Sequence, residues 1–268
     1  NQYTKAYENK GLVLIELERF DEALSCFQIA SELKPDDYEI HNNIGIAFMG
    51  LKQFNEAIAH YNISLKFNPK YAKAHNNRGL VYQELLRFDE ALIDFNHAIQ
   101  IKNDYAEAIN NRGLLYKDQR LFDKAILDLE FAFKLNPNLL EINFNLSMIY
   151  LLQLNFKEGW KNYEKRKNVS EYLKKTQPFN KIYLTEIPKD HEPILLHSEQ
   201  GIGDQIIFLS LLDEAIKLPN PILIQLEPRL ISLFKRSFPA INFYSDKEKL
   251  CPSLYKYHAL FGSLPQFF

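Results

Sequence analysis

Two sets of residues in this sequence have types and spacing suited to chemistry. The first is a column of asparagines repeated every 34 residues, and it consists of Asn9, Asn43, Asn77, Asn111 and Asn145. A carboxamide both donates and accepts hydrogen bonds, so this asparagine column can pair with the C=O and N–H groups of an extended peptide of any sequence. The second set is a loop formed by Glu199, Gln200, Gly201, Ile202, Gly203 and Asp204. It follows a short apolar strand, and α/β sheets place their ligand sites at the carboxyl ends of strands.

The asparagine column needs an explanation, because asparagine is a poor residue for a helix interior, where its amide competes with the backbone for hydrogen bonds. One explanation is peptide binding. Neighbouring helices pack about 8–10 Å apart and an extended peptide advances about 3.3 Å per residue, so each asparagine would meet roughly every third peptide residue. The alternative is that the amides form local caps or hydrogen bonds between repeats and contact no ligand.

The elements that must position the asparagine column follow the same period of 34 residues. Five further columns keep this register: Gly11, Gly45, Gly79, Gly113 and Ser147; Ala23, Ala57, Ala91, Ala125 and Gly159; Phe20, Phe54, Phe88, Phe122 and Phe156; Phe27, Tyr61, Phe95, Leu129 and Tyr163; and Leu14, Phe48, Tyr82, Tyr116 and Tyr150. Small residues are expected where two helices approach closely, and the large ones fill the space between helices. Such a period is typical of stacked helical hairpins, because one hairpin cannot bury its apolar face alone. The sequence therefore predicts an α-solenoid of five helix-turn-helix repeats at residues 4–37, 38–71, 72–105, 106–139 and 140–173.

Local signals mark the ends of the helices. Proline stops a helix before it, and Pro35, Pro69 and Pro137 close their repeats, with Asn103 at the corresponding position of the third. Four residues are predicted to cap the second helices: Asp21, Asn55, Asp89 and Asp123. The fifth repeat has Gly159 in the alanine column and no closing proline, so the solenoid is expected to end there.

This pattern resembles the tetratricopeptide-repeat (TPR) family over residues 4–173. The resemblance implies a right-handed superhelix whose first helices line a concave groove, and the expected partner is an extended peptide or protein segment in that groove. The asparagine column is similar to the asparagine ladder of the O-linked N-acetylglucosamine transferases, which hold protein substrates by such a row.

Neighbouring polar residues of the first helices leave further choices open. Asn42, Asn76 and Asn110 widen the polar strip, whereas Arg78 and Arg112 are either groove charges or side chains packed between helices. His41 and His75 share a column without a partner column of carboxylates or thiols. They are interpreted as structural, and no metal site is expected.

The sequence changes class after the repeats. Residues 174–192 contain charges and two prolines with little helical period, so they are interpreted as a connector. In residues 193–268, strands are predicted at 194–197, 221–226 and 241–244, and helices at 204–217 and 229–237. This alternation indicates a partial α/β, Rossmann-like domain with a parallel sheet.

The loop at 199–204 lacks the third glycine of a dinucleotide fingerprint, and an acid at the helix start would repel a phosphate. Nicotinamide or flavin binding is therefore not expected. The run from Gly159 and Trp160 through His197 to Phe208 instead resembles bacterial TPR proteins with a glycosyltransferase-like domain, similar to the two-Rossmann (GT-B) ADP-heptose heptosyltransferases. The resemblance implies that Asp204, after Gly203, is the base that deprotonates the acceptor hydroxyl, without a metal. The alternatives are an N-cap for Asp204 and a tight turn for Gly201 and Gly203.

Composition bounds the remaining choices. Lys and Arg total 32 against 34 Asp and Glu, so the net charge of −2 gives no general attraction for nucleic acid. Cys26 and Cys251 form no CxxC pair, which excludes a zinc knuckle and a disulfide framework and predicts two small packing residues in a cytoplasmic protein. The sequence contains neither a signal pattern nor an apolar stretch that would span a membrane. Because the first residue is not methionine and half a GT-B unit follows residue 193, the chain is expected to be a fragment.

Together these features predict a TPR arm that binds a protein or peptide and presents it as acceptor to a glycosyltransferase-like domain. The parent would be an inverting enzyme with a nucleotide sugar as donor. This chain is expected to hold no cofactor and to show no turnover alone, because a GT-B enzyme builds most of its donor pocket from the second Rossmann half. The alternative is a TPR scaffold with a degenerate, non-catalytic α/β domain.

Overall fold

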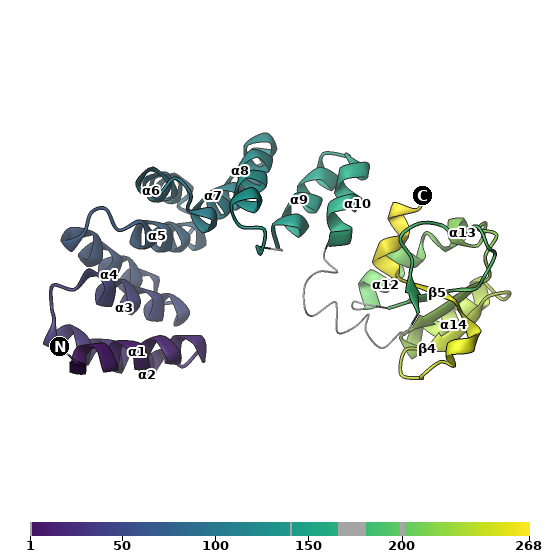
Figure 1. The fold of residues 1–268 in the computed structure, drawn as a ribbon, viewed down its shortest axis with the longest axis horizontal. Helices are drawn as coiled ribbons and strands as arrows, with labels where there is room; N and C mark the ends of the chain where they lie inside the picture. The colour runs from purple at the N-terminus through teal and green to yellow at the C-terminus, as the bar shows by residue number, and fades with distance from the viewer. Residues whose placement is uncertain (1, 140, 166–180, 199–201) are drawn as a thin grey trace. The chain divides into compact units, whose positions relative to one another are not determined.

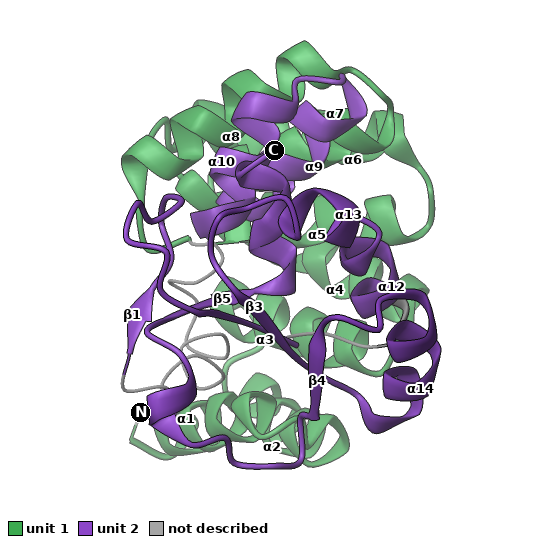
Figure 2. Cartoon of the chain, turned by 90° about the vertical axis from the view of Figure 1, so that its right-hand side faces the viewer, with its two compact units in different colours: residues 1–142 green, residues 143–268 purple. Residues whose placement is uncertain are grey.

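The computed structural model describes residues 2–139, 141–165, 181–198 and 202–268. It divides into two compact units, residues 1–142 and 143–268 (Figure 2). The first unit contains four helical hairpins that follow one another along the chain (Figure 1): α1 Gln2–Glu16 with α2 Phe20–Leu33, α3 Tyr38–Gly50 with α4 Phe54–Phe67, α5 Ala72–Glu84 with α6 Phe88–Ile101, and α7 Ala106–Asp118 with α8 Phe122–Leu135. The helical solenoid predicted from the period is therefore confirmed.

Each hairpin turn contains a residue in the left-handed backbone region. These residues recur every 34 positions with φ between 57° and 60°, and they are Glu18, Lys52, Leu86, Arg120 and Leu154. The amide of each residue donates to the carbonyl three positions earlier, and the next amide donates to the carbonyl five positions before it, as in Leu86 N to Gln83 O and Arg87 N to Tyr82 O. This Schellman arrangement satisfies the last carbonyls of the first helix and reverses the chain direction. It also holds a residue with a Cβ where glycine is preferred.

The substitution Leu86→Gly is expected to raise the free energy of unfolding by about 0.5–1 kcal/mol. Relief of the left-handed strain favours glycine by about 1–2 kcal/mol, and the greater backbone entropy of glycine in the unfolded chain offsets about half of that gain. The Leu86 side chain is 74% exposed, so little packing is lost. Urea unfolding followed by circular dichroism measures the change. Leu86→Ala shortens the same side chain without relieving φ, and an equal gain from alanine would contradict this explanation.

The two helices of each hairpin pack closely at the glycine column, where a large side chain of the second helix lies against a glycine of the first. A Cβ built on Gly11 would lie 2.5 Å from the Phe27 ring, and Gly45 faces the Tyr61 ring in the same way. The four large residues that face these glycines, namely Phe27, Tyr61, Phe95 and Leu129, are fully buried, as are Ala23, Ala57, Ala91 and Ala125. Within the first unit, α1 contacts α3, α3 contacts α5 and α5 contacts α7, whereas successive second helices approach less closely. The first helices therefore form the inner, more crowded side of the stack.

The second helices begin one residue earlier than the predicted caps. They start at Phe20, Phe54, Phe88 and Phe122, so Asp21, Asn55, Asp89 and Asp123 are the second residues of their helices and not N-caps. The three aspartates lie in the first turn, where a negative charge interacts favourably with the helix dipole. The cap prediction was wrong because the left-handed turn residue, and not a side-chain cap, sets the start of the helix.

The second unit contains helices α9 Glu141–Leu152 and α10 Phe156–Glu164 and a small parallel sheet with its own helices. Its strands are β1 Ile182–Tyr183, β2 Ile194–His197, β3 Ile222–Leu226, β4 Asn242–Ser245 and β5 Tyr257–Leu260. They are all parallel and lie in the order β1-β5-β2-β3-β4. Helices α12 Ile202–Leu209, α13 Leu212–Ala215 and α14 Pro228–Ser237 connect them, with short 3-10 helices at Pro252–Leu254 and Phe261–Gln266.

One face of the sheet packs on these helices. The apolar cluster there includes Ile194, Leu196 and Ile224 from the strands and Leu209, Leu212 and Leu230 from the helices. The predicted parallel sheet is confirmed at its three expected strands. The expected helix at 204–217 is interrupted between Leu209 and Leu212, and β1 lies within the expected connector. β5 was missed because four residues between irregular segments carry no clear alternation. Cys26 is buried as expected, but Cys251 is exposed, so its packing role was wrong.

Candidate functional site: the asparagine column and the sheet edge

The asparagine column lies on the first helices of the hairpins. Asn9 on α1 is exposed, Asn43 on α3 is buried, and Asn77 on α5 and Asn111 on α7 are half-buried. Asn145 lies on α9 in the second unit and is also half-buried. Within the first unit, the column therefore follows the inner row of helices.

Hydrogen bonds between asparagines connect three successive repeats. The Nδ2 of Asn77 donates to Oδ1 of Asn42 at 3.0 Å, and the Nδ2 of Asn111 donates to Oδ1 of Asn76 at 2.9 Å. Within each repeat, the amide of the preceding asparagine donates at 3.4 Å to the asparagine of the column, as in Asn76 to Asn77. Hydrogen bonds between repeats, one of the two explanations for the column, are therefore present.

These bonds leave part of each amide unused. A carboxamide offers two N–H donors and two acceptor lone pairs. In the described structure, Asn77 and Asn111 each use one donor toward the previous repeat and one lone pair toward their neighbour. One donor and one lone pair remain on each of two half-exposed side chains whose orientation is already fixed.

An apolar column that the sequence analysis missed follows the asparagines at a distance of three residues. Its members are Leu12, Ile46, Leu80, Leu114 and Met148. Positions i and i+3 lie on one side of a helix. Ile46, Leu80 and Leu114 are half-buried and Leu12 is 40% exposed. The strict period of 34 residues was the signal that could have identified this column.

The two arginines of the first helices are tied to carboxylates of the second helices and are not free groove charges. Arg78 donates from Nε and Nη2 to the two oxygens of Asp94, both at 2.7 Å, and also donates to Asn62 of the previous repeat. Arg112 repeats this arrangement with Asp128 and Asn96. Burial would by itself raise the pKa of Asp94, but the hydrogen bonds from Arg78 and His75 hold that pKa below its ordinary value. The Arg78 side chain therefore joins two repeats.

The histidine column has a backbone partner in both repeats. The Nε2 atoms of His41 and His75 lie 2.9 and 3.1 Å from the carbonyls of Pro35 and Pro69. A carbonyl only accepts, so each Nε2 carries a proton and donates it. This contact fixes the loop before each first helix.

Family comparisons match the hairpins of the first unit. Models described as "TPR repeat" match residues 11–52 and 47–85, and models described as "Tetratricopeptide repeat" match residues 72–105 and 106–139. Residues 11–139 are tetratricopeptide repeats. No protein of curated function matches the chain in sequence.

Solved TPR structures share the fold at low identity. The thermophilic TPR protein TTC0263 of Thermus thermophilus has 24% identity and a TM-score of 0.57 over 62% of this chain and 91% of its own. pilF of Pseudomonas aeruginosa has 16% identity and a TM-score of 0.62 over 89% and 93%. MamA of Desulfovibrio magneticus has 20% identity and a TM-score of 0.52 over 66% and 98%. These likenesses establish the TPR fold alone.

The second predicted site lies at the carboxyl edge of the sheet. Glu199, Gln200 and Gly201 are outside the described residues, and Gly203 lies in the first turn of α12. Asp204 is exposed in the same turn, inside the helix and not at its cap. Because β3 lies on one side of β2 and β5 on the other, the strand order reverses at β2, and open α/β sheets bind ligands at such a point.

The sequence analysis did not single out two buried histidines, of which His197 lies at this edge and His258 lies opposite Leu195 within the sheet. His197 ends β2, and its Nε2 lies 3.1 Å from Nδ1 of His258 on β5. Burial, with a smaller effect of the charge on His258, lowers the pKa of His197 to about 3. Because β5 was not predicted, nothing in the sequence indicated that His258 would lie beside His197.

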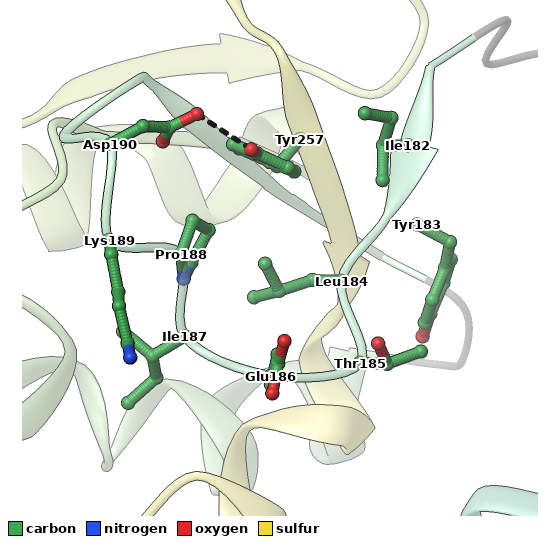
Figure 3. A pocket seen from close by; sticks show the side chains of 10 residues that line it. All are labelled: Ile182, Tyr183, Leu184, Thr185, Glu186, Ile187, Pro188, Lys189, Asp190 and Tyr257. Atoms are coloured by element: carbon green, nitrogen blue, oxygen red, sulfur yellow. Dashed lines mark hydrogen bonds between the residues drawn. The ribbon is translucent and has the colours of Figure 1, made fainter.

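A pocket of about 600 Å³ lies beside β1, and it is lined by residues 182–190 and Tyr257 (Figure 3). Asp190 accepts hydrogen bonds there from Lys256 at 2.6 Å and from the Tyr257 hydroxyl at 2.7 Å. These hydrogen bonds lower the pKa of Asp190 to about 2, so the carboxylate is charged at neutral pH. The residues that line this pocket include neither a member of the asparagine column nor a residue of the loop at 199–204.

Among the helices that the structure describes, none combines the length and the apolar character needed to cross a bilayer.

Proposed function

We propose that the TPR unit binds an extended segment of a partner protein along the asparagine column of its first helices. The observation that carries this proposal is the unused hydrogen-bonding capacity of Asn77 and Asn111, whose amides are held in place by bonds to the previous repeat. Amides that are fixed before binding lose little entropy when a ligand arrives. The one donor and one acceptor left on Asn77 and on Asn111 match the C=O and N–H of a peptide backbone.

The apolar column supports the same function. Leu12, Ile46, Leu80 and Leu114 place a partly exposed aliphatic side chain three residues after each asparagine. A polar row therefore lies beside an apolar row on the inner helices. The polar row would pair with peptide backbone and the apolar row would contact peptide side chains, which is how extended peptides gain both affinity and selectivity.

Asn77→Ala is expected to weaken retention of a peptide library by about 10-fold, since a hydrogen bond to a peptide is worth about 0.5–1.5 kcal/mol and its unpaired partner costs more. Asn42→Ala is the matched control, because it breaks the same bond between repeats from the other side and leaves the amide of the asparagine column present. Asn42 is 2% exposed and cannot contact a ligand.

The two variants separate binding from structure. Both are expected to lose similar stability in urea unfolding followed by circular dichroism, but only Asn77→Ala is expected to lose peptide. Equal retention by the two variants would show that the column serves the contacts between repeats alone.

We further propose that the second unit is the first part of a glycosyltransferase-like domain of the heptosyltransferase type. The observation that favours it is the parallel order β1-β5-β2-β3-β4, in which β4-β3-β2-β5 has the same order as the first four strands of a doubly wound sheet and reverses at β2. In this proposal the solenoid binds the acceptor protein for the same polypeptide. The competing function is a TPR scaffold whose α/β unit is not catalytic.

Asp204 is the proposed base of this domain. Its exposed carboxylate lies in the first turn of the helix after β2, within the edge where ligands bind. It would accept the proton of the acceptor hydroxyl while the hydroxyl oxygen bonds to the sugar carbon and the nucleoside diphosphate leaves, with inversion at that carbon. Gln205 anchors the helix, because its Oε1 accepts from the Glu227 amide after β3 at 3.1 Å.

Asp204→Asn in the product of the full gene is expected to lower transfer from nucleotide sugars by at least about 100-fold, which is the usual contribution of a general base. Product formation measured with a panel of nucleotide sugars tests this expectation. Asp213→Asn on α13 is the control for a lost surface carboxylate. Equal turnover by the Asp204 variant would remove Asp204 from the mechanism, and absence of turnover from the full gene product would favour the scaffold. The 268-residue chain alone is expected to show no turnover.

A further inference from the structure

The third repeat contains a side-chain cluster that the peptide-binding function does not use. His75 on α5 and Asp94 and His97 on α6 each place one potential ligand atom within 4.8 Å of the others. Asp94 and His97 are three positions apart, so they lie on one side of α6. His75 and Asp94 are buried, whereas His97 is exposed and keeps the cluster open to solvent. The His75 and His97 rings lie 5.1 Å apart.

The hydrogen bonds of His75 leave one ring nitrogen aimed at a carboxylate. Its Nε2–H donates to the Pro69 carbonyl at 3.1 Å, so in the neutral ring the Nδ1 atom carries a lone pair. That Nδ1 atom lies 3.0 Å from Oδ1 of Asp94. Two lone pairs at this distance repel each other, so the contact requires a positive species at Nδ1, either a proton or a metal ion.

The geometry suits a metal ion. Two donors that each lie about 2.1 Å from one ion are about 3.0 Å apart at the right angle of an octahedral site and about 3.4 Å apart at the tetrahedral angle. The 3.0 Å separation of His75 Nδ1 and Asp94 Oδ1 fits the right angle. Ligating histidines commonly donate their second ring N–H to a backbone carbonyl, as His75 does to Pro69. Arg78 donates to both oxygens of Asp94, which orients the carboxylate and leaves a second lone pair on Oδ1.

We infer that His75, Asp94 and His97 bind a divalent transition-metal ion of the imidazole-preferring class, such as Zn²⁺, Ni²⁺ or Co²⁺. The ion would join the two helices of the third hairpin and keep positions open to solvent on the side of His97. The arrangement is specific to this repeat. In the second repeat, His60 replaces the aspartate and Ile63 replaces His97, and in the fourth repeat Ile109 replaces His75.

Cobalt titration of the tag-free 268-residue protein tests the inference. We expect ligand-field absorption that saturates at one Co²⁺ per chain, and a melting temperature that rises with Co²⁺ concentration. His97→Ala removes an exposed ligand without opening the core, and it is expected to weaken Co²⁺ binding at least about 10-fold. His60→Ala and His191→Ala are the controls, because they remove histidines outside the cluster, and both are expected to keep the signal.

Two results would overturn the inference. The first is absence of Co²⁺ absorption and of any thermal shift at millimolar Co²⁺, together with ¹⁵N chemical shifts that show protons on both nitrogens of His75. That result would identify an imidazolium–carboxylate pair in place of a metal site. The second is an unchanged signal in His97→Ala with circular dichroism equal to that of the parent chain, which would place the bound ion elsewhere.

Discussion

Asp94→Ala is expected to lower the free energy of unfolding of the TPR unit by about 3–5 kcal/mol, the usual cost of removing one partner from a buried ion pair. The Asp94 side chain is 1% exposed and bonds to Arg78 twice and to His75 once. Its loss leaves a largely buried guanidinium without a counterion. The carboxylate also fixes the position from which Arg78 donates to Asn62 of the previous repeat, so its loss weakens that contact between repeats.

Asp128→Ala is the matched control in the fourth repeat. Asp128 accepts the same two bonds from Arg112, but its side chain is 13% exposed and Ile109 stands in place of the histidine. A cost of about 1.5–3 kcal/mol is expected there, as for hydrogen bonds to a charged group. Urea unfolding followed by far-ultraviolet circular dichroism measures both. A loss for Asp94→Ala no larger than that for Asp128→Ala would show that burial and the contact with His75 add nothing.

The same carboxylate predicts a dependence on pH. The pKa of Asp94 in the folded chain lies below its ordinary value of 3.8. The folded state therefore binds the proton less readily than the unfolded state, so the stabilisation is complete above about pH 4 and is lost as the pH falls toward the folded pKa. As the pH is lowered below about 4, the free energy of unfolding is accordingly expected to fall less in Asp94→Ala than in the parent chain.

The second large effect is expected in the sheet unit and comes from His197. The pKa of this 3% exposed imidazole falls to about 3 on folding, from an ordinary value of 6.5. The unfolded chain takes up a proton below pH 6.5 that the folded chain rejects. Stability is therefore unaffected above about pH 6.5 and decreases by up to about 1.4 kcal/mol per pH unit as the pH falls below it. Between about pH 7 and pH 5 we expect a loss of about 2 kcal/mol.

The single tryptophan makes this measurement specific. Trp160 packs on the apolar cluster of the sheet unit, so its fluorescence reports unfolding of that unit. His197→Gln keeps a polar side chain that never ionises, and it is expected to flatten the pH dependence between about pH 7 and pH 5. His191→Gln removes an exposed histidine and is expected to leave the slope unchanged. An unchanged slope in His197→Gln would show that another group causes the acid sensitivity.

The proposed metal site and the proposed peptide site both use α5 but make different demands on it. Asn77 presents its amide on the inner row of helices, whereas His75 is buried against α6. Variants of Asn77 are expected to leave Co²⁺ binding unchanged. His97→Ala tests the metal without altering the asparagine column, so one proposal can fail without the other.

The repeat architecture was determined by the sequence itself. Because the glycine column and the aromatic column both repeat every 34 residues, their members pair one to one along the chain, and Gly45 indeed faces the Tyr61 ring. The strand at residues 194–197 was equally evident because three consecutive apolar residues follow Pro193. Such features depend on periodicity and local propensity, which are properties of neighbouring residues along the chain.

The tertiary structure decided which partner each polar group takes. Asn77 had two explanations in the sequence, and the packing of α5 on α3 was needed to show that its amide reaches Asn42, 35 residues earlier. Arg78 and His75 meet Asp94 from another helix, and β5 enters the sheet between β1 and β2 from the far end of the unit. A hydrogen bond forms only within narrow limits of distance and angle. The choice among competing partners therefore depends on helix and strand positions that no local pattern specifies.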